Sequence, residues 1–228
     1  MAAFASADDE VYVLTSQPGT GGGTYRFERS LASSNDWQTL PIPFGPGSQV
    51  TDLEAHGSSV WLLGASAMPS PGMRNELAHS TNEGASFATV PGPCIPGLGG
   101  TLAPDSSTVV WAVCPTGMAA GAWRSVDAGT SFIPLATGEL PNSAELAPAT
   151  DTTALLAANN GTSGLLRTIN AGETWTLAAA PASGDPIMFL GFTDAEVGAA
   201  LVSIGAGTQS QLWRTTDGGA VWSVVLLG

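Results

Sequence analysis

Short apolar segments alternate along this chain with clusters of Gly, Pro, Ser, Asn and Asp, so that no apolar run continues for long. The segments Ala2–Ala7, Glu10–Gln17 and Thr24–Leu31 have the length and composition of β-strands, and Trp37–Leu40 follows them closely. No window shows a sustained 3.6-residue period, and 29 Gly and 16 Pro among 228 residues disfavour long helices. The pattern therefore predicts an all-β protein.

One polar pattern recurs between the predicted strands. A Ser or Thr is followed two residues later by Asp or Asn, then two residues later by Gly, and three residues after that by Phe or Trp. Gly tolerates the positive φ of a tight turn, and the side-chain oxygens can accept hydrogen bonds from main-chain N–H groups inside it. The pattern predicts four hairpin turns with aromatic anchors: Ser80, Asn82, Gly84 and Phe87; Ser125, Asp127, Gly129 and Phe132; Thr168, Asn170, Gly172 and Trp175; and Thr215, Asp217, Gly219 and Trp222.

A fifth copy is incomplete, because Ser30 and Trp37 keep its ends while Ala32 and Ser34 replace the acidic residue and the Gly. The five copies start at intervals of 50, 45, 43 and 47 residues. Repeats of this length, each made of four strands, are typical of β-propeller blades. Continuously apolar second strands such as Val60–Leu63 fit sheets that are covered on both faces. We expect one β-propeller domain over residues 1–228, with blades at about 2–43, 49–91, 99–135, 144–178 and 186–227.

The repeated turn resembles the Asp-box (BNR) repeat of sialidases and of many other β-propeller proteins. The resemblance implies that each turn joins the third and fourth strands of a blade at its periphery, away from any active site, and it carries no catalytic residue to this chain.

Sialidases also use an inward-facing Arg triad and a Tyr nucleophile paired with Glu. Four arginines here precede the first turn residue of their repeats, His79 takes that place in the second repeat, and only Arg26 and Arg74 lie elsewhere; the four are Arg29, Arg124, Arg167 and Arg214. Such a column can bind a carboxylated sugar, but a residue repeated in every blade favours a structural role. With Tyr12 and Tyr25 as the two tyrosines, sialidase activity is not expected.

Acidic residues in the predicted innermost strands are the candidate ligand site. Aligned on the following strand, Glu54 stands where other repeats have apolar residues, namely Phe4, Leu102, Leu146 and Phe192. We therefore select Asp52, Glu54, His56 and Glu145 as candidate ligand-binding residues, with Asp194 as a further inner-strand acid. The alternative is that the alignment is off by one residue and these side chains face a water-filled channel.

The charge of the chain and the motifs that it lacks argue against several classes of partner and cofactor. The net charge is −13, with six Arg and no Lys, which disfavours nucleic acid and anionic lipid as partners. There is no run of 18 apolar residues and no signal peptide, so we expect a processed, secreted or cell-envelope protein. No zinc spacing and no nucleotide-binding motif is present, so neither a metal nor a cofactor is expected.

The two cysteines are predicted to form a disulfide. Cys94 precedes the first strand of the third repeat and Cys114 ends the second, so strands that pair around a turn at Asp105–Ser107 bring both to one end of a hairpin. A disulfide implies an oxidising compartment.

These observations favour a non-enzymatic, exported binding or scaffold propeller, a monomer that contacts a protein or a neutral glycan. Two alternatives remain open. One is a glycoside hydrolase-like enzyme that uses inner-strand carboxylates. The other is a set of blades cut from, or built to mimic, a larger propeller, with no activity of its own. We expect the blades to form without strand exchange between the two ends of the chain.

Overall fold

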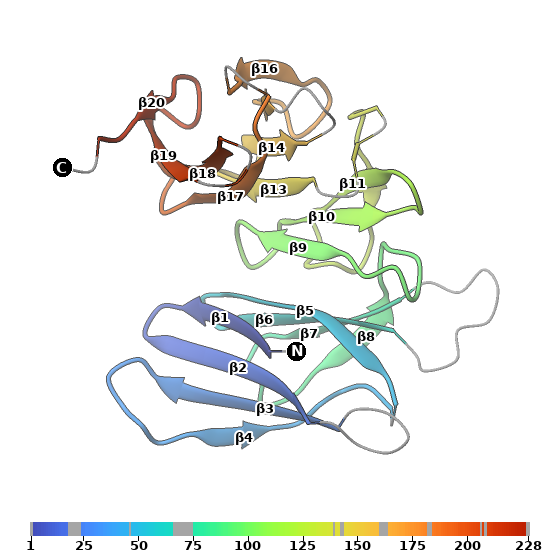
Figure 1. Cartoon of the computed structure of the whole chain (residues 1–228). Helices are drawn as coiled ribbons and strands as arrows, with labels where there is room; N and C mark the ends of the chain where they lie inside the picture. The colour runs from blue at the N-terminus through green and yellow to red at the C-terminus, as the bar shows by residue number, and fades with distance from the viewer. Residues whose placement is uncertain are drawn as a thin grey trace. The chain divides into compact units, whose positions relative to one another are not determined.

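A computed structural model describes residues 2–17, 24–45, 47–65, 75–138, 140–141, 144–159, 164–181, 184–205, 207 and 209–226. Within these ranges every regular element is a β-strand, and the strands form five four-stranded sheets (Figure 1). This part of the chain accordingly contains no helix with the length and apolarity that a membrane span requires. The fold is that of a β-propeller with five blades, as predicted, and each sheet is one blade.

The four strands of each blade are consecutive in the sequence and keep chain order across the sheet. Blade one contains β1 (Ala2–Ala7), β2 (Glu10–Gln17), β3 (Thr24–Leu31) and β4 (Gln38–Leu40), and blade two contains β5 (Gln49–His56), β6 (Ser59–Ala65), β7 (Glu76–Ser80) and β8 (Ala88–Pro91). Blade three contains β9 (Thr101–Pro104), β10 (Val110–Pro115), β11 (Ala120–Ser125) and β12 (Ile133–Pro134). Blade four contains β13 (Glu145–Pro148), β14 (Ala154–Ala158), β15 (Gly164–Thr168) and β16 (Thr176–Ala179), and blade five contains β17 (Ile187–Phe192), β18 (Val197–Ile204), β19 (Gln209–Thr216) and β20 (Ser223–Val224). The first and the last blade thus each supply all four of their own strands.

The chain divides into two compact units. The first unit comprises Met1–Cys114 and Ser125–Ile133, and the second comprises Pro115–Arg124 and Pro134–Gly228. Blades one and two belong to the first unit, blades four and five belong to the second, and the strands of blade three belong partly to each.

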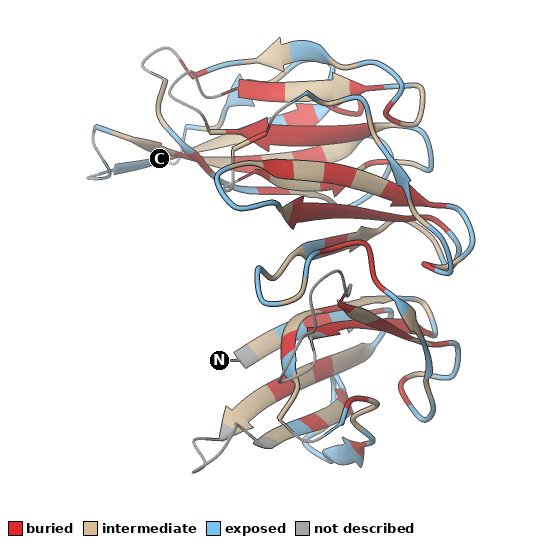
Figure 2. Ribbon diagram, turned by 90° about the vertical axis from the view of Figure 1, so that its right-hand side faces the viewer, coloured by how far each residue is buried: buried red, intermediate tan, exposed pale blue. Residues whose placement is uncertain are grey.

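The second strands of blades two, three and four are buried almost throughout, as their apolar sequences predicted, whereas on β2 and β18 buried residues alternate with partly exposed ones. Val60, Trp61, Leu62 and Leu63 on β6 are all inaccessible to solvent, and β14 is buried along its whole length. Figure 2 shows that buried residues gather on the strands, while most connecting loops are exposed or intermediate. In the first unit, residues of blades one and two, including Tyr12, Phe27 and Leu53, form one apolar core cluster. In the second unit, residues of blades four and five form another. Each cluster therefore joins the facing surfaces of two successive blades.

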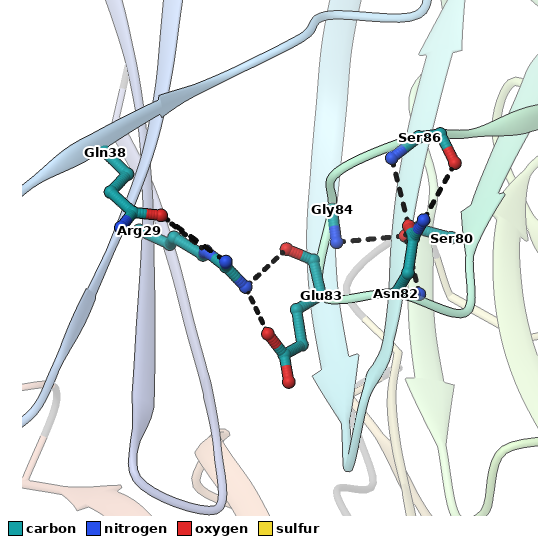
Figure 3. Close-up of polar contacts among 7 residues, drawn as sticks. All are labelled: Arg29, Gln38, Ser80, Asn82, Glu83, Gly84 and Ser86. Atoms are coloured by element: carbon teal, nitrogen blue, oxygen red, sulfur yellow. Dashed lines mark hydrogen bonds and ion pairs between the residues drawn. The ribbon is translucent and has the colours of Figure 1, made fainter.

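The four predicted hairpin turns, called repeat turns below, have the hydrogen bonds that their sequence indicated. In the turn of blade two, the Ser80 hydroxyl accepts hydrogen bonds from the N–H groups of Gly84 (2.9 Å) and Asn82 (3.2 Å), while Asn82 Oδ1 accepts one from Ser86 N–H (3.0 Å; Figure 3). The same bonds recur in the other three turns. Each turn places two successive residues at positive φ, such as Glu83 (58°) and Gly84 (79°). Backbone conformation, in addition to hydrogen bonding, therefore selects Gly at the second of these positions.

Blade one, in which two residues of the pattern are replaced, departs from this geometry. The Ser30 hydroxyl donates to the carbonyl groups of Leu31 (3.2 Å) and Ser34 (3.4 Å) instead of accepting from the turn. The turn has the same number of residues as the other four, but its conformation is different.

The aromatic residues of the repeat turns are less buried than expected. Trp61 and Trp111 on the second strands are fully buried, whereas Trp222, Trp175, Phe132 and Phe87 are only partly buried, and Trp37 is 42% exposed. The aromatic anchors of the turns are therefore only partly buried, unlike the tryptophans of the second strands. They lie beside short outer strands, where little of the chain is available to cover them.

The predicted disulfide between Cys94 and Cys114 is confirmed, with a Cα–Cα distance of 5.0 Å. β9 pairs with β10 so that Thr101 lies opposite Val113, and the chain before β9 therefore reaches the end of β10 where Cys114 lies.

Candidate functional site

Asp52 and Glu54 lie on the same face of β5, in the first unit. Glu54 pairs with Trp61 on β6, and Trp61 Nε1 donates to the carbonyl of Ala128 in the repeat turn of blade three (3.0 Å). Asp52 Oδ2 accepts a hydrogen bond from the N–H of Leu102 on β9 (2.6 Å). Leu53 points to the opposite face and joins the core cluster with blade one. The two carboxyl groups are therefore directed toward blade three.

The strand pairing corrects the alignment on which Glu54 was selected. In each blade the first residue of the turn pairs with a residue of the second strand, and that residue pairs with one of the first strand. When the blades are aligned on this first-strand residue, Phe4 and Leu146 correspond to Leu53, and Phe192 corresponds to Ala55. The position of Glu54 is held by small residues in the other blades for which this count can be made: Ala5, Ala147 and Gly191. Glu54 thus replaces a small side chain that faces the next blade. The alignment was off by one residue, but the two acids are mostly buried instead of facing open solvent.

Burial gives these two carboxyl groups different pKa values. Burial raises the pKa of Asp52 to about 6, although the N–H groups of Leu102 and Leu53 oppose this shift. Burial also raises the pKa of Glu54, to about 9, and the negative charge of Asp52 adds to the shift. At neutral pH the pair therefore holds one proton, on Glu54, which can both donate and accept a hydrogen bond.

The other two candidate residues, His56 and Glu145, do not belong to this buried pair. His56 ends β5 and is exposed. Glu145 begins β13, opposite Ala157 in the second unit, and burial raises its pKa. Asp194 was expected on an inner strand but lies in the turn between β17 and β18, where its carboxylate accepts hydrogen bonds from the N–H groups of Glu196 (2.8 Å) and Val197 (2.7 Å). Asp52 and Glu54 are the members of the set that the structure brings onto one face.

The arginine column holds successive blades together. Arg29 Nη1 donates to the Glu83 carbonyl (3.3 Å) and pairs with the Glu83 carboxylate, and Arg167 Nε donates to the Gly218 carbonyl (2.8 Å). Glu83 and Gly218 occupy the same position in the repeat turns of the following blades. Arg124 Nη2 donates to the Asp151 carbonyl of blade four (2.7 Å).

Blade two has His79 at this position in place of arginine. The His79 ring stacks on Trp61, with ring centroids 4.8 Å apart, and Trp61 makes the bond to blade three. The bonds of Arg29, Arg124 and Arg167 to the following blade support a structural role for these three, while Arg214 on β19 is exposed. Arg26 pairs with Glu28 (2.7 Å), and Arg74 lies outside the described residues.

Sequence reasoning missed a cavity of about 280 Å³ beside the altered turn of blade one. Its walls are Glu10, Arg29, Ser30, Leu31, Ser34, Asp36 and Gln38. The signal that could have located it was the absence of the repeat pattern at Ala32 and Ser34. No group of three or more His, Cys, Asp or Glu residues suited to a metal ion occurs in the part of the chain that the structure describes.

No protein-family model matches the sequence, and no curated protein does either. Solved structures are similar to it. A GH74 xyloglucanase from Xanthomonas campestris has a TM-score of 0.66 at 20% identity, over 98% of this chain and 38% of its own. A GH74 enzyme from Niastella koreensis has a TM-score of 0.67 at 15% identity, over 97% of this chain and 37% of its own.

YCF48 from Cyanidioschyzon merolae has a TM-score of 0.59 at 15% identity, over 97% of this chain and 68% of its own. This chain thus spans less than two fifths of the length of either GH74 protein. At these identities the likeness establishes the β-propeller fold of this chain.

Proposed function

We propose that this chain is a non-enzymatic, exported binding or scaffold propeller that contacts a neutral, hydroxyl-rich ligand at Asp52 and Glu54. In this proposal residues 1–228 form one monomeric domain, its repeat turns are structural Asp-boxes, and no cofactor takes part. The observation that carries the proposal is the common orientation of the two carboxyl groups on β5. His56, at the exposed end of the same strand, extends the site toward solvent.

Side chains two residues apart on one strand reach a ligand from the same side, with Cβ atoms about 7 Å apart. Glycoside hydrolysis instead needs two carboxyl groups that flank the scissile bond. Asp52 is also held by the N–H of Leu102, which fixes its orientation. A fixed acceptor beside a protonated carboxyl suits the recognition of hydroxyl groups, which both donate and accept. The disulfide and the low content of charged residues agree with an exported protein.

Hydrolysis of a neutral glycoside is the second candidate function. It is favoured by the raised pKa of Glu54, because a carboxyl group that keeps its proton at neutral pH can act as a general acid. The fold similarity to a GH74 xyloglucanase makes xyloglucan oligosaccharides the first substrates to test.

Two substitutions of Glu54 separate binding from catalysis. Glu54→Gln keeps a neutral group that donates and accepts, and we expect it to bind a neutral glycan from an immobilised panel about as well as the wild type. Glu54→Ala restores the residue found at Ala5 and Ala147 in other blades, so it should fold, but we expect it to lose that binding. Glu173→Gln, at an exposed acid in blade four, is the control.

The two functions predict different results for turnover. Hydrolysis of xyloglucan oligosaccharides that Glu54→Gln abolishes would establish the enzyme instead of the binding protein. Equal glycan binding by the wild type and Glu54→Ala, with no hydrolysis, would contradict this site for both functions.

A further inference from the structure

The cavity beside blade one lies where the repeat turn is lost. In an intact turn, the Asp or Asn side chain fills the interior, as Asn82 does through its bonds to Ser86 N–H and to the Ser86 hydroxyl (2.9 Å; Figure 3). Ala32 stands at this position in blade one and has no group that can make these bonds. Ser34 stands where the other turns have a Gly at positive φ. Ser30, Leu31, Ser34 and Asp36 of the altered turn all belong to the wall of the cavity.

Most of the hydrogen-bonding groups in the cavity wall are already engaged. Arg29 bonds to Glu83 on one side and to Gln38 Oε1 (3.4 Å) on the other, so its charge is compensated (Figure 3). The Ser30 hydroxyl donates within the turn, and the Ser34 hydroxyl accepts from Asp36 N–H (3.0 Å). These groups shape the cavity and contribute little free capacity to bind a ligand.

The carboxylates of Glu10 and Asp36 are different. Glu10 Oε2 is buried and accepts no hydrogen bond within the described structure. Burying a carboxylate oxygen without a hydrogen-bond donor costs free energy. Rotation about χ3 does not remove this cost, because it only exchanges the two oxygens of the carboxylate. Asp36 is exposed at the opposite end of the turn. The wall holds two acids, Glu10 and Asp36, against one cation, Arg29, which also pairs with Glu83, so its net charge is negative.

We propose that this cavity binds one guanidinium or ammonium group, carried by a small organic cation or by a basic side chain of a partner protein. Such a group supplies several N–H donors and one positive charge, which match an unpartnered carboxylate oxygen and a second acid at the rim. A volume of about 280 Å³ accommodates one such group with its short stem and excludes a bulky ligand. This site is formed within blade one and does not depend on the function proposed for Asp52 and Glu54.

Isothermal titration of the whole chain with matched probes tests the proposal. The probes are butylguanidinium, the tripeptide amide acetyl-Gly-Arg-Gly, and the same peptide with citrulline, which keeps the shape of arginine without its charge. We expect the charged probes to bind at least about tenfold more tightly than the citrulline peptide. Binding of butylguanidinium alone assigns the cavity to a free cation, and binding of both charged probes shows that a side chain can also enter. Equal binding of the arginine and citrulline peptides would overturn the proposal.

Variants locate the site and separate it from the general attraction of an acidic protein for cations. We expect Glu10→Gln and the exposed Asp36→Asn each to weaken the binding of butylguanidinium about tenfold, while Glu173→Gln leaves it unchanged. The double substitution Ala32→Asn with Ser34→Gly restores the repeat pattern and should fill the cavity, which abolishes binding while raising the unfolding temperature. If Glu10→Gln does not fold, Asp36→Asn and the double variant still decide the matter. Unchanged affinity in all of the folded cavity variants would show that the cation does not bind here.

Discussion

At the scale of single residues, Glu54 is the least expected side chain of the fold. A carboxyl group occupies a position that other blades give to Ala or Gly, opposite a fully buried Trp61. Such a group is tolerated because it keeps its proton, and the cost of burying a negative charge is avoided. Its protonation therefore links the stability of the first unit to pH.

Stability should fall as the pH rises from about 5 to 9. The folded state raises the pKa of Glu54 from 4.5 to about 9, so the folded protein holds this proton more tightly than the unfolded chain does. The stabilisation that comes from this proton is complete below the pKa of Glu54 in the unfolded chain, and it is lost as the pH rises through the pKa of Glu54 in the folded protein. Asp52 adds the same trend below about pH 6. We expect Glu54→Gln to be more stable than the wild type at pH 9 by about 1–3 kcal/mol. Urea unfolding at pH 5, 7 and 9 measures this, and parallel pH profiles for the two proteins would contradict it.

Gly219 is the residue at which backbone conformation and packing coincide. Its φ is 80°, and a Cβ there would overlap the Leu155 side chain of the preceding blade. We expect Gly219→Val to cost at least about 1–3 kcal/mol from backbone strain alone. Gly45→Val is the control, because Gly45 has an ordinary φ and open space around it. Thermal unfolding of both variants compares them, and an equal loss of stability in the two would argue against this account.

At the scale of elements, local sequence predicts most of the fold. The first three predicted strands have the bounds of β1, β2 and β3, and the repeat turns follow from residues that satisfy one another within eight positions. The orientation of Glu54 was not predictable in the same way. In either register Glu54 aligns with uncharged residues of the other inner strands, such as Phe4 or Ala5, so composition alone did not fix the alignment. The cavity was missed for a related reason, since it comes from the absence of a pattern.

The connections between blades also depend on groups that the repeat does not specify fully. Arg29 and Arg167 reach the same carbonyl position in the following turn, yet blade two makes this bond with Trp61 from a neighbouring strand. The carbonyl of a turn residue held at positive φ therefore serves as a fixed acceptor, and different donors can reach it. This explains how His79 can replace arginine without the loss of the connection between blades.

At the scale of the whole molecule, the disulfide should contribute strongly to stability. Cys94 and Cys114 are 20 residues apart, and closing a loop of this size is worth about 3 kcal/mol in the chain-entropy model. We expect reduction, or the double substitution of both cysteines by Ala, to lower the free energy of unfolding by about that amount. Titration of the unfolded, unreduced protein should detect no free thiol; two free thiols would show that the bond does not form in the isolated protein.

The same structure predicts that the purified protein does not cleave sialosides. Tyr12 is fully buried in the core cluster between blades one and two, so its hydroxyl cannot reach a sugar without unfolding part of the blade. Arg29, Arg124 and Arg167 are bonded to neighbouring blades, so these three cannot act as a triad that binds a carboxylate; Arg214 on β19 is exposed. The acids of the candidate site would in addition repel a carboxylated sugar once they are ionised. We expect no release of fluorophore from a sialoside at pH 5 or pH 7. Turnover that Tyr12→Phe abolishes, with the unfolding temperature unchanged, would require a Tyr12 that is open to substrate, and this structure would then fail to describe the active protein.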